Sequence, residues 1–153
     1  FQSIKDSGSL PITDVRMTRF MISLDQGVEL VWHAFSDMEG GETYVRKSPS
    51  MNICDIARVV APEAKQEIVG IRPGEKLHEQ MVGFEDAAYT FEYPDMFKIL
   101  PVINNWSSSP ERIKDGVPVA ADFTYASDNN TNWMDPADLK LWIDANRGKI
   151  GTF

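Results

Sequence analysis

The sequence predicts an α/β protein built from helices and short strands. Three observations support this fold class. Stretches with apolar residues near 3.6 spacing alternate with short stretches of β-branched and aromatic residues. Glycine and proline separate most of these stretches, which keeps the links short. The chain has 153 residues, of which 42% are hydrophobic, so it can bury a core but is too short for a complete doubly wound domain.

The expected elements follow in chain order. They are an irregular stretch at 4–16, a helix from Met17 or Thr18 to about Met38, a strand at 42–46, a helix at 51–60, a strand at 66–71, a short helix at 75–82, paired strands at 89–93 and 96–100, a loop-rich region at 103–132, and a final helix. Ser50 is expected to cap the second helix, which Pro62 stops. Asp135 is expected to cap the final helix, with Pro136 in its first position and Gly148 at its end.

Charge and cysteine content restrict the classes of partner. The net charge is −8 and the isoelectric point is about 4.7, so the chain lacks the basic surface expected for binding nucleic acid or an anionic membrane. Any anion site must be a local pocket of a few arginines. Cys54 is the only cysteine, which excludes an internal disulfide and favours a reducing, cytoplasmic setting. The sequence shows no stretch of membrane-spanning length and no signal peptide.

The first residues differ from the rest of the chain. Phe1-Gln2-Ser3 lacks an initiator methionine and matches the end of a common cleavable tag linker. We therefore expect residues 1–3 to be a tag remnant, and the chain to be a piece of something longer.

Several motifs of autonomous enzymes are missing. The sequence has no Gly-x-Gly-x-x-Gly after a strand, no Walker loop, no Gly-x-Ser-x-Gly elbow and no Tyr-x-x-x-Lys pair. His33 and His78 are far apart and lack partners at metal-ligand spacing. No catalytic residue, cofactor site or metal site is therefore predicted in this chain.

The first candidate binding stretch contains Arg16, Thr18 and Arg19. If a helix begins there, both arginines lie on one face, near free backbone N–H groups that favour a diphosphate. Thr18 could add its hydroxyl or its N–H group. The alternative is that both arginines are solvated residues at a helix start and that Thr18 is a helix cap.

The second candidate stretch is Arg72-Pro73-Gly74-Glu75, which follows an apolar run. Proline fixes the backbone and glycine permits a tight turn, so the pair makes a rigid corner. Arg72 offers a planar fork to phosphate oxygens, and Glu75 can accept hydrogen bonds from both hydroxyls of a ribose. The alternative is a plain helix start in which Glu75 complements the helix dipole.

Together these stretches resemble the substrate-binding part of extended short-chain dehydrogenases that act on sugar nucleotides. The segments RMTRF, KSPSM, IRPGEKLHE and FTYASDNNTNWM are, in this order, similar to the inverting UDP-N-acetylglucosamine 4,6-dehydratases of the pseudaminic acid type. The resemblance covers about Leu10 to Ile143. It implies that Arg19, with Phe20 opening a helix, and Arg72 hold the pyrophosphate, and that Glu75 holds the ribose.

The resemblance also implies what this chain lacks. In the family, NADP takes hydride from C4 of the sugar, water is eliminated across C5 and C6, and hydride returns to C6. The NADP site and the catalytic residues lie in an N-terminal Rossmann half that is absent here. Residues 4–153 are thus expected to form the sugar-nucleotide-binding C-terminal domain, which binds no cofactor alone and is not catalytic alone. Its exposed apolar surface is expected to contact the missing half or another copy, giving a homo-oligomer.

Two other functions remain open at this point. A sugar-nucleotide 4-epimerase of the same superfamily would share the arginine and Arg-Pro-Gly-acid motifs. A non-enzymatic module for nucleotide-sugar binding or assembly would need no upstream half. The stretch FTYASDNNTNWM favours the dehydratase.

Overall fold

The structure is a computed structural model that describes residues 8–146. The expectation that residues 1–3 are a tag remnant, and the expected helix end at Gly148, lie outside the described residues. The chain divides into two compact units, each assembled from separate segments. Within the described range, the first unit takes residues 8–21, 49–79 and 130–146, and the second takes residues 22–48 and 80–129.

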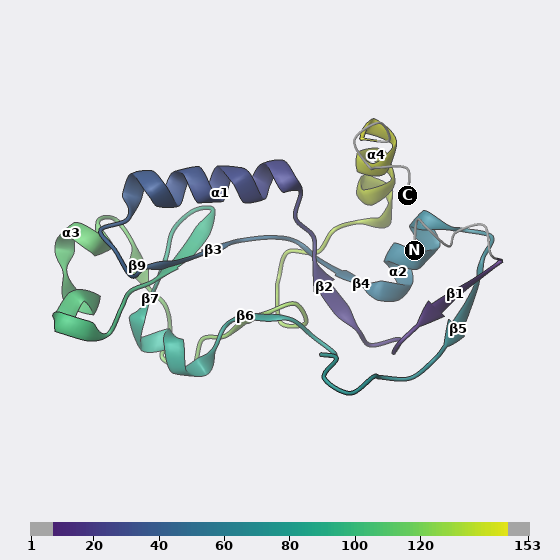
Figure 1. Cartoon of the computed structure of the whole chain (residues 1–153), viewed down its shortest axis with the longest axis horizontal. Helices are drawn as coiled ribbons and strands as arrows, with labels where there is room; N and C mark the ends of the chain where they lie inside the picture. The colour runs from purple at the N-terminus through teal and green to yellow at the C-terminus, as the bar shows by residue number, and fades with distance from the viewer. Residues whose placement is uncertain (1–7, 147–153) are drawn as a thin grey trace. The chain divides into compact units, whose positions relative to one another are not determined.

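The first unit contains two small sheets and two helices, whose elements are labelled in Figure 1. Its elements are β1 (Ser9–Ile12), β2 (Thr18–Phe20), β4 (Ser50–Asn52), α2 (Ile53–Val60), β5 (Lys65–Ile68) and α4 (Pro136–Ala145). Strand β1 pairs in parallel with β5, and β2 pairs antiparallel with β4. Leu10 and Ile12 of β1 are fully buried against Ala57 of α2, because alternate strand residues face the helix.

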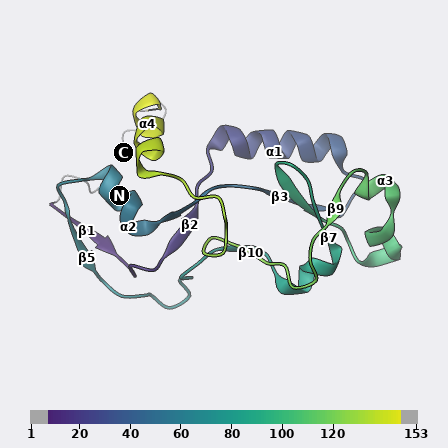
Figure 2. The same ribbon diagram turned by 180° about the vertical axis from the view of Figure 1, so that it is seen from behind.

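The second unit is built on a four-stranded antiparallel sheet in the order β3-β8-β7-β9. These strands are β3 (Thr43–Arg46), β7 (Thr90–Glu92), β8 (Met96–Ile99) and β9 (Val117–Pro118). The unit also contains α1 (Leu24–Asp37), β6 (Gln80–Val82), η2 (Phe84–Tyr89), η3 (Ile103–Ser108), α3 (Pro110–Ile113) and β10 (Tyr125–Ala126). Strand β6 pairs antiparallel with β10, which Figure 2 labels.

A buried ion pair joins α1 to this sheet. Lys98 lies on β8, one of the two inner strands, and its side chain is 1% exposed. Its ammonium group pairs with the carboxylate of Asp37 at the end of α1. Lys98 also donates to the carbonyl oxygen of Arg112 at 3.0 Å. The rings of Tyr44 and Tyr93 lie 5.5 and 5.0 Å from the ammonium group, so the charge is surrounded by favourable partners.

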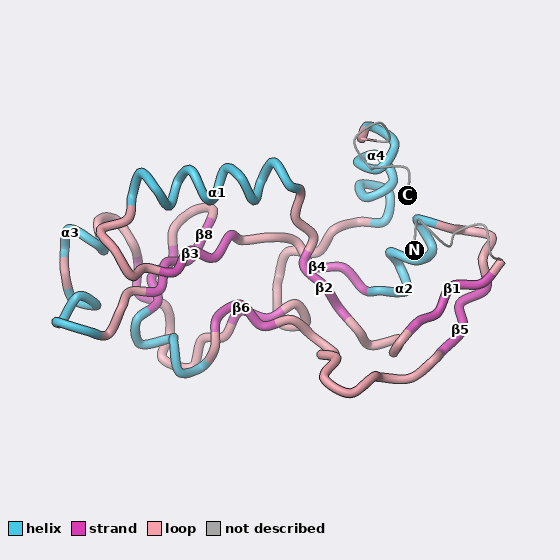
Figure 3. Tube along the Cα trace, viewed as in Figure 1, coloured by secondary structure: helices cyan, strands magenta, loops and turns pink. Residues whose placement is uncertain are grey.

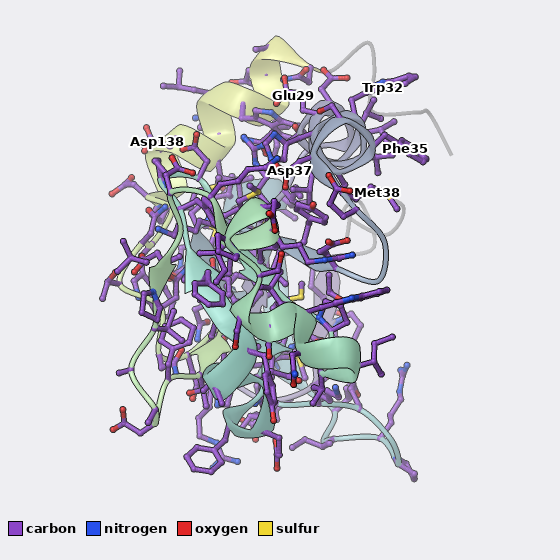
Figure 4. All side chains as sticks on the ribbon, turned by 90° about the vertical axis from the view of Figure 1, so that its left-hand side faces the viewer. Glu29, Trp32, Phe35, Asp37, Met38 and Asp138 are labelled. Carbon is purple, nitrogen blue, oxygen red and sulfur yellow. The ribbon has the colours of Figure 1, made fainter. Side chains whose placement is uncertain are left out.

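The opposite side of α1 carries an apolar surface. Figure 4 shows Trp32, Phe35 and Met38 on one side of this helix and Asp37 on the other. Together with Leu24, Val28 and Val31 they follow helical spacing, and each of the six side chains is at least 45% exposed. We call these six residues the α1 apolar face.

The structure corrects the expected first helix. Residues Thr18–Phe20 form strand β2, and the helix starts only at Leu24. Ser23 sets the start of the helix. Its side chain accepts a hydrogen bond from the N–H of Gln26, and the Gln26 side chain accepts one from the N–H of Ser23. This capping box fixes the helix terminus six residues after Met17. Three of the residues before it, Thr18–Phe20, instead form a strand paired with β4.

Other boundaries differ for similar local reasons. Asn52, not Ser50, caps α2, because Ser50 belongs to β4. No helix forms over 75–82: residues 75–79 are irregular, as Figure 3 shows, and β6 follows. The strand expected at 66–71 ends at Ile68 and is not buried, and part of the stretch expected to be irregular at 4–16 forms β1.

The main features of the fold class are confirmed. The protein is a mixed α/β chain of helices and short strands. Strand β3, the β7–β8 hairpin and the Asp135 cap of α4 lie where the sequence predicts them. The loop-rich region at 103–132 contains only short elements. Across residues 8–146, none of the helices combines the length and the apolar composition that crossing a membrane requires.

Candidate functional site

The Arg-Pro-Gly-Glu stretch forms a tight turn in the first unit. The N–H of Glu75 donates to the carbonyl oxygen of Arg72 at 3.0 Å, which closes the turn across Pro73 and Gly74. Gly74 has a φ of +82°, a conformation that side chains other than glycine adopt only with strain. Proline in the second position and glycine with positive φ in the third are the pattern of a type II turn. The expected rigid corner is therefore confirmed, although no helix follows it.

The Glu75 carboxylate is held at this corner from two sides. One oxygen accepts a hydrogen bond from the Thr13 hydroxyl at 3.2 Å, and the other lies 3.3 Å from the N–H of Arg72. Glu75 is half-buried, whereas Arg72 is exposed. Among the described residues, no side chain or carbonyl group pairs with the Arg72 guanidinium. The corner thus presents one free cationic fork beside one oriented carboxylate.

Arg19 and Thr18 reach the chain just beyond the corner. The Arg19 guanidinium donates to the carbonyl oxygens of Lys76 and Leu77 at 3.1 and 3.2 Å. The Thr18 hydroxyl lies 2.8 Å from Nδ1 of His78, and the Thr18 N–H donates to the Leu77 carbonyl at 3.1 Å. Strand β2 and segment 76–78 are therefore joined side by side, and Thr18 and Arg19 lie beside the corner that carries Arg72.

Arg16 is engaged with a different partner. Its guanidinium makes two hydrogen bonds to the carboxylate of Asp14, at 3.0 and 2.8 Å, and its side chain is 68% exposed. The hydrogen bond from Arg16 lowers the pKa of Asp14 to about 2. Neither Arg16 nor Arg19 lies at a helix start, so the predicted cradle of helical N–H groups around these arginines is wrong.

Sequence reasoning missed two members of this arrangement. His78, which lies in the stretch expected to form a short helix, is half-buried and bonded to Thr18. Thr13, in the stretch expected to be irregular, orients Glu75. The contacts of Thr13 with Glu75 and of Thr18 with His78 join residues 62 and 60 positions apart, and no spacing within the sequence indicates them.

The described part of the chain contains a cavity but no cluster of metal-binding side chains. Over residues 8–146, no group of histidine, cysteine, aspartate and glutamate side chains is arranged to hold a metal ion. The second unit contains a cavity of about 370 Å³ lined by side chains of both charges, including Glu29, Arg46, Lys114 and Asp115. None of the five predicted binding residues lines it.

The comparison with protein families decides where the chain belongs. Residues 1–101 match the sequence model of the family described as "Polysaccharide biosynthesis protein". The chain belongs to this polysaccharide biosynthesis family. Its relatives include the inverting UDP-N-acetylglucosamine 4,6-dehydratases of two Campylobacter jejuni strains, of serotypes O:2 and O:23/36, which are each 41% identical over 91% and 93% of this chain.

Less similar relatives are named for a different activity. A UDP-glucose 4-epimerase of Rickettsia massiliae is 31% identical over 92% of this chain. Among solved structures, the X-ray structure of Pen from Bacillus thuringiensis matches 95% of the chain with a TM-score of 0.77 and 27% identity. The chain spans 43% of the length of the O:2 dehydratase and 43% of the Pen chain. The resemblance to sugar-nucleotide dehydratases is thus confirmed, for a segment of such a protein.

Proposed function

We propose that this chain is the UDP-sugar-binding portion of a UDP-N-acetylglucosamine 4,6-dehydratase in nucleotide-sugar and polysaccharide biosynthesis, and that it is not catalytic alone. The observation that carries the proposal is the corner at residues 72–75. A guanidinium that has no partner within residues 8–146 stands three residues before a carboxylate that two hydrogen bonds orient. The identity to the Campylobacter dehydratases supports the choice of reaction.

Each of the five predicted site residues has a role in this proposal. Arg72 binds the diphosphate, because its fork matches two phosphate oxygens. Glu75 accepts hydrogen bonds from the ribose hydroxyls. Arg19 and Thr18 belong to the same site through β2. Arg16 would add positive charge only by leaving Asp14, so we expect its contribution to be the smallest. Binding energy from the UDP moiety would position the sugar for chemistry in another part of the protein.

The remaining parts of the proposal concern the whole protein. We infer an N-terminal Rossmann half that binds NADP, a cytoplasmic location and a product that leads towards pseudaminic acid. The sequence of this chain carries no glycine-rich dinucleotide fingerprint, so NADP is not expected to bind it alone. The α1 apolar face is proposed to pack against the preceding half of the polypeptide, because the relatives are more than twice as long as the span they share with this chain.

A 4-epimerase is the second candidate function, supported by the 31% identity to the Rickettsia enzyme. The two activities differ in their products, because dehydration removes water from the sugar and epimerisation does not. Incubating the full-length protein with UDP-N-acetylglucosamine and measuring the product by mass spectrometry separates them. A mass loss of one water supports the dehydratase, and an unchanged mass with inverted C4 supports the epimerase. A parent gene without a Rossmann half would favour the binding or assembly module.

Calorimetric titration with UDP and UDP-N-acetylglucosamine tests the binding site. It is made with this chain and with the full-length protein, using Arg72→Ala and Glu75→Gln. The matched controls are Arg58→Ala and Glu63→Gln, which remove charges of the same sign from exposed positions away from the corner. We expect each corner variant to weaken binding by about tenfold or more, and each control to leave it unchanged. Full-length protein that binds UDP equally well in all variants would contradict the assignment.

A further inference from the structure

Residues 75–79 follow the corner and belong to no helix or strand. Backbone groups in such a segment need partners from elsewhere, because unpaired buried donors and acceptors are costly. Here β2 supplies them. The N–H of Thr18 and the guanidinium of Arg19 both donate to the carbonyl oxygen of Leu77, and Arg19 also donates to that of Lys76.

We call the contact between β2 and residues 76–79 the junction, and side chains contribute to it as well as backbone groups. The Thr18 hydroxyl, on a residue that is 4% exposed, lies 2.8 Å from the His78 imidazole. The Nε atom of Arg19 lies 3.5 Å from the carboxylate of Glu79. Every residue from Lys76 to Glu79 is therefore bonded to Thr18 or Arg19, through either its backbone or its side chain.

All three nitrogens of the Arg19 guanidinium have protein partners in this arrangement. Nη1 donates to the carbonyl oxygens of Thr18 and Leu77, at 2.7 and 3.2 Å. Nη2 donates to the Lys76 carbonyl and to the sulfur of Met17, both at 3.1 Å. This contrasts with Arg72, whose guanidinium has no protein partner among the described residues. The two arginines thus differ in role before any ligand is present.

Strand β2 is itself a firm support for this junction. It pairs with β4 from Thr18 to Phe20, and the carbonyl oxygen of Met17 accepts from the N–H of Ile53 at the start of α2. Met17 and Met51 are 2% and 1% exposed. A guanidinium fixed to this strand can therefore hold the irregular backbone beyond Glu75 in one position.

We propose that Arg19 is a positioning residue that holds segment 76–79 on β2 and thereby fixes Glu75 and the corner before substrate binds. This role rests on the proposed function, because the corner is the part of the site that it serves. It is separate from any contact of Arg19 with a diphosphate, since carbonyl oxygens and not phosphates are its partners here. It predicts that Arg19 matters for ligands that carry no phosphate.

Hydrogen–deuterium exchange of the ligand-free chain tests the positioning directly. We expect Arg19→Ala and Arg19→Lys to speed exchange of the amide protons of Thr18 and Glu75 by about tenfold, because these N–H groups donate to the carbonyl oxygens of Leu77 and Arg72, and lysine keeps the charge of Arg19 but not its fork. Glu79→Gln removes the ion pair with Arg19 but keeps the bonds from Arg19 to the carbonyl oxygens of Lys76 and Leu77, so it should have a smaller effect. Exchange in β3 and β8 serves as the folding control. A folded Arg19→Ala chain with unchanged exchange at these positions would overturn the proposal.

Titration with uridine and with UDP connects the positioning to binding. Arg19→Ala should weaken uridine and UDP by similar factors, because Glu75 is displaced, whereas Arg72→Ala should weaken UDP alone. Loss of UDP affinity with full uridine affinity in Arg19→Ala would overturn the proposal and leave Arg19 as a phosphate ligand. If the unaltered chain and the full-length protein bind neither compound, the proposed function is wrong, and Arg19 does not position a binding site. The exchange experiment would then show only whether Arg19 holds residues 76–79 on β2.

Discussion

The hydroxyl group of Tyr44 donates a hydrogen bond to the carboxylate of Asp37 across 2.7 Å, which ties strand β3 to the end of helix α1. The same carboxylate also pairs with Lys98 and Lys114. Asp37 thus neutralises a lysine that is almost completely buried in the sheet. The second unit depends on this carboxylate more than on any exposed ion pair, because an unpaired buried charge is costly.

Asp37→Asn is therefore expected to destabilise the chain by about 3 kcal/mol, since it leaves Lys98 buried without a counter-charge. Asp115→Asn is the matched control, because Asp115 is an exposed aspartate near the same lysines and should cost less than about 0.5 kcal/mol. Urea unfolding at pH 7 measures both. Equal stability of the two variants would show that the buried pair contributes nothing.

The Asp37 pair also makes stability depend on pH. Burial raises the pKa of Asp37, but hydrogen bonds from Lys114, Lys98 and Tyr44 outweigh it and hold this pKa well below its usual range. The folded state then binds fewer protons than the unfolded state, so the contribution is present above the unfolded pKa of about 4 and is lost as the pH falls below it. The difference in unfolding free energy between the unaltered chain and Asp37→Asn should be full at pH 7 and should shrink as the pH falls below about 4. A difference that stays constant over this range would contradict the assignment.

Tyr125 provides a second test of the second unit. Its buried hydroxyl accepts from the N–H of Ser48 at 2.8 Å and donates to the Ser48 carbonyl oxygen at 3.0 Å. Tyr125→Phe leaves both backbone groups without this partner and should cost about 1–3 kcal/mol. Tyr89→Phe is the control, because no hydrogen bond of the Tyr89 hydroxyl is found among the described residues. Thermal unfolding should therefore show a lower midpoint for Tyr125→Phe alone.

Replacing Gly74 or Gly27 by alanine should change the stability of the chain in opposite directions. Gly74 has a φ of +82°, so Gly74→Ala strains the corner even though a Cβ atom would meet nothing within 4 Å. We expect a loss of about 1 kcal/mol and weaker binding of UDP. Gly27 lies inside α1 with equally open surroundings, so Gly27→Ala should stabilise the chain by about 0.5–1 kcal/mol. Denaturation of the two variants in parallel checks the signs, and a stabilising Gly74→Ala would refute the turn.

The α1 apolar face predicts how the chain behaves in solution. Without the preceding half, we expect concentration-dependent self-association, which Trp32→Lys and Phe35→Lys reduce. Leu141→Lys on α4 is the control for replacing an exposed apolar residue with lysine elsewhere. Sedimentation velocity measures all three. If the full-length protein loses its self-association with the same α1 changes, the face binds a second copy and not the preceding half.

Short sequence patterns correctly predicted the parts of the fold that depend on residues close together in the sequence. The Asp135 cap, the β7–β8 hairpin and the Pro73-Gly74 turn each result from chemistry within a few residues. The error at residues 17–23 has a physical cause. The apolar residues there resemble the first turn of a helix, but the capping box at Ser23 competes with them and pairing with β4 takes over.

The candidate site shows the same division. The turn that places Arg72 near Glu75 was predictable, because the sequence of the turn itself encodes it. The partners of Arg19 were not predictable, because the carbonyl oxygens of Lys76 and Leu77 lie 57 and 58 positions away in sequence. Carbonyl acceptors are the same for every residue type, so sequence alone carries no signal for them.

The interleaved assembly of the two units affects how the chain is synthesised. The backbone passes from one unit to the other four times, at residues 21–22, 48–49, 79–80 and 129–130. All segments of the second unit have left the ribosome once residue 129 has emerged. The first unit is still incomplete then, because the stretch that places Trp133 beside Ser50 and forms α4 comes later in the chain. The unit that carries the corner is thus the last to close during translation, and a single proteolytic cut between the units would release neither of them as one continuous peptide.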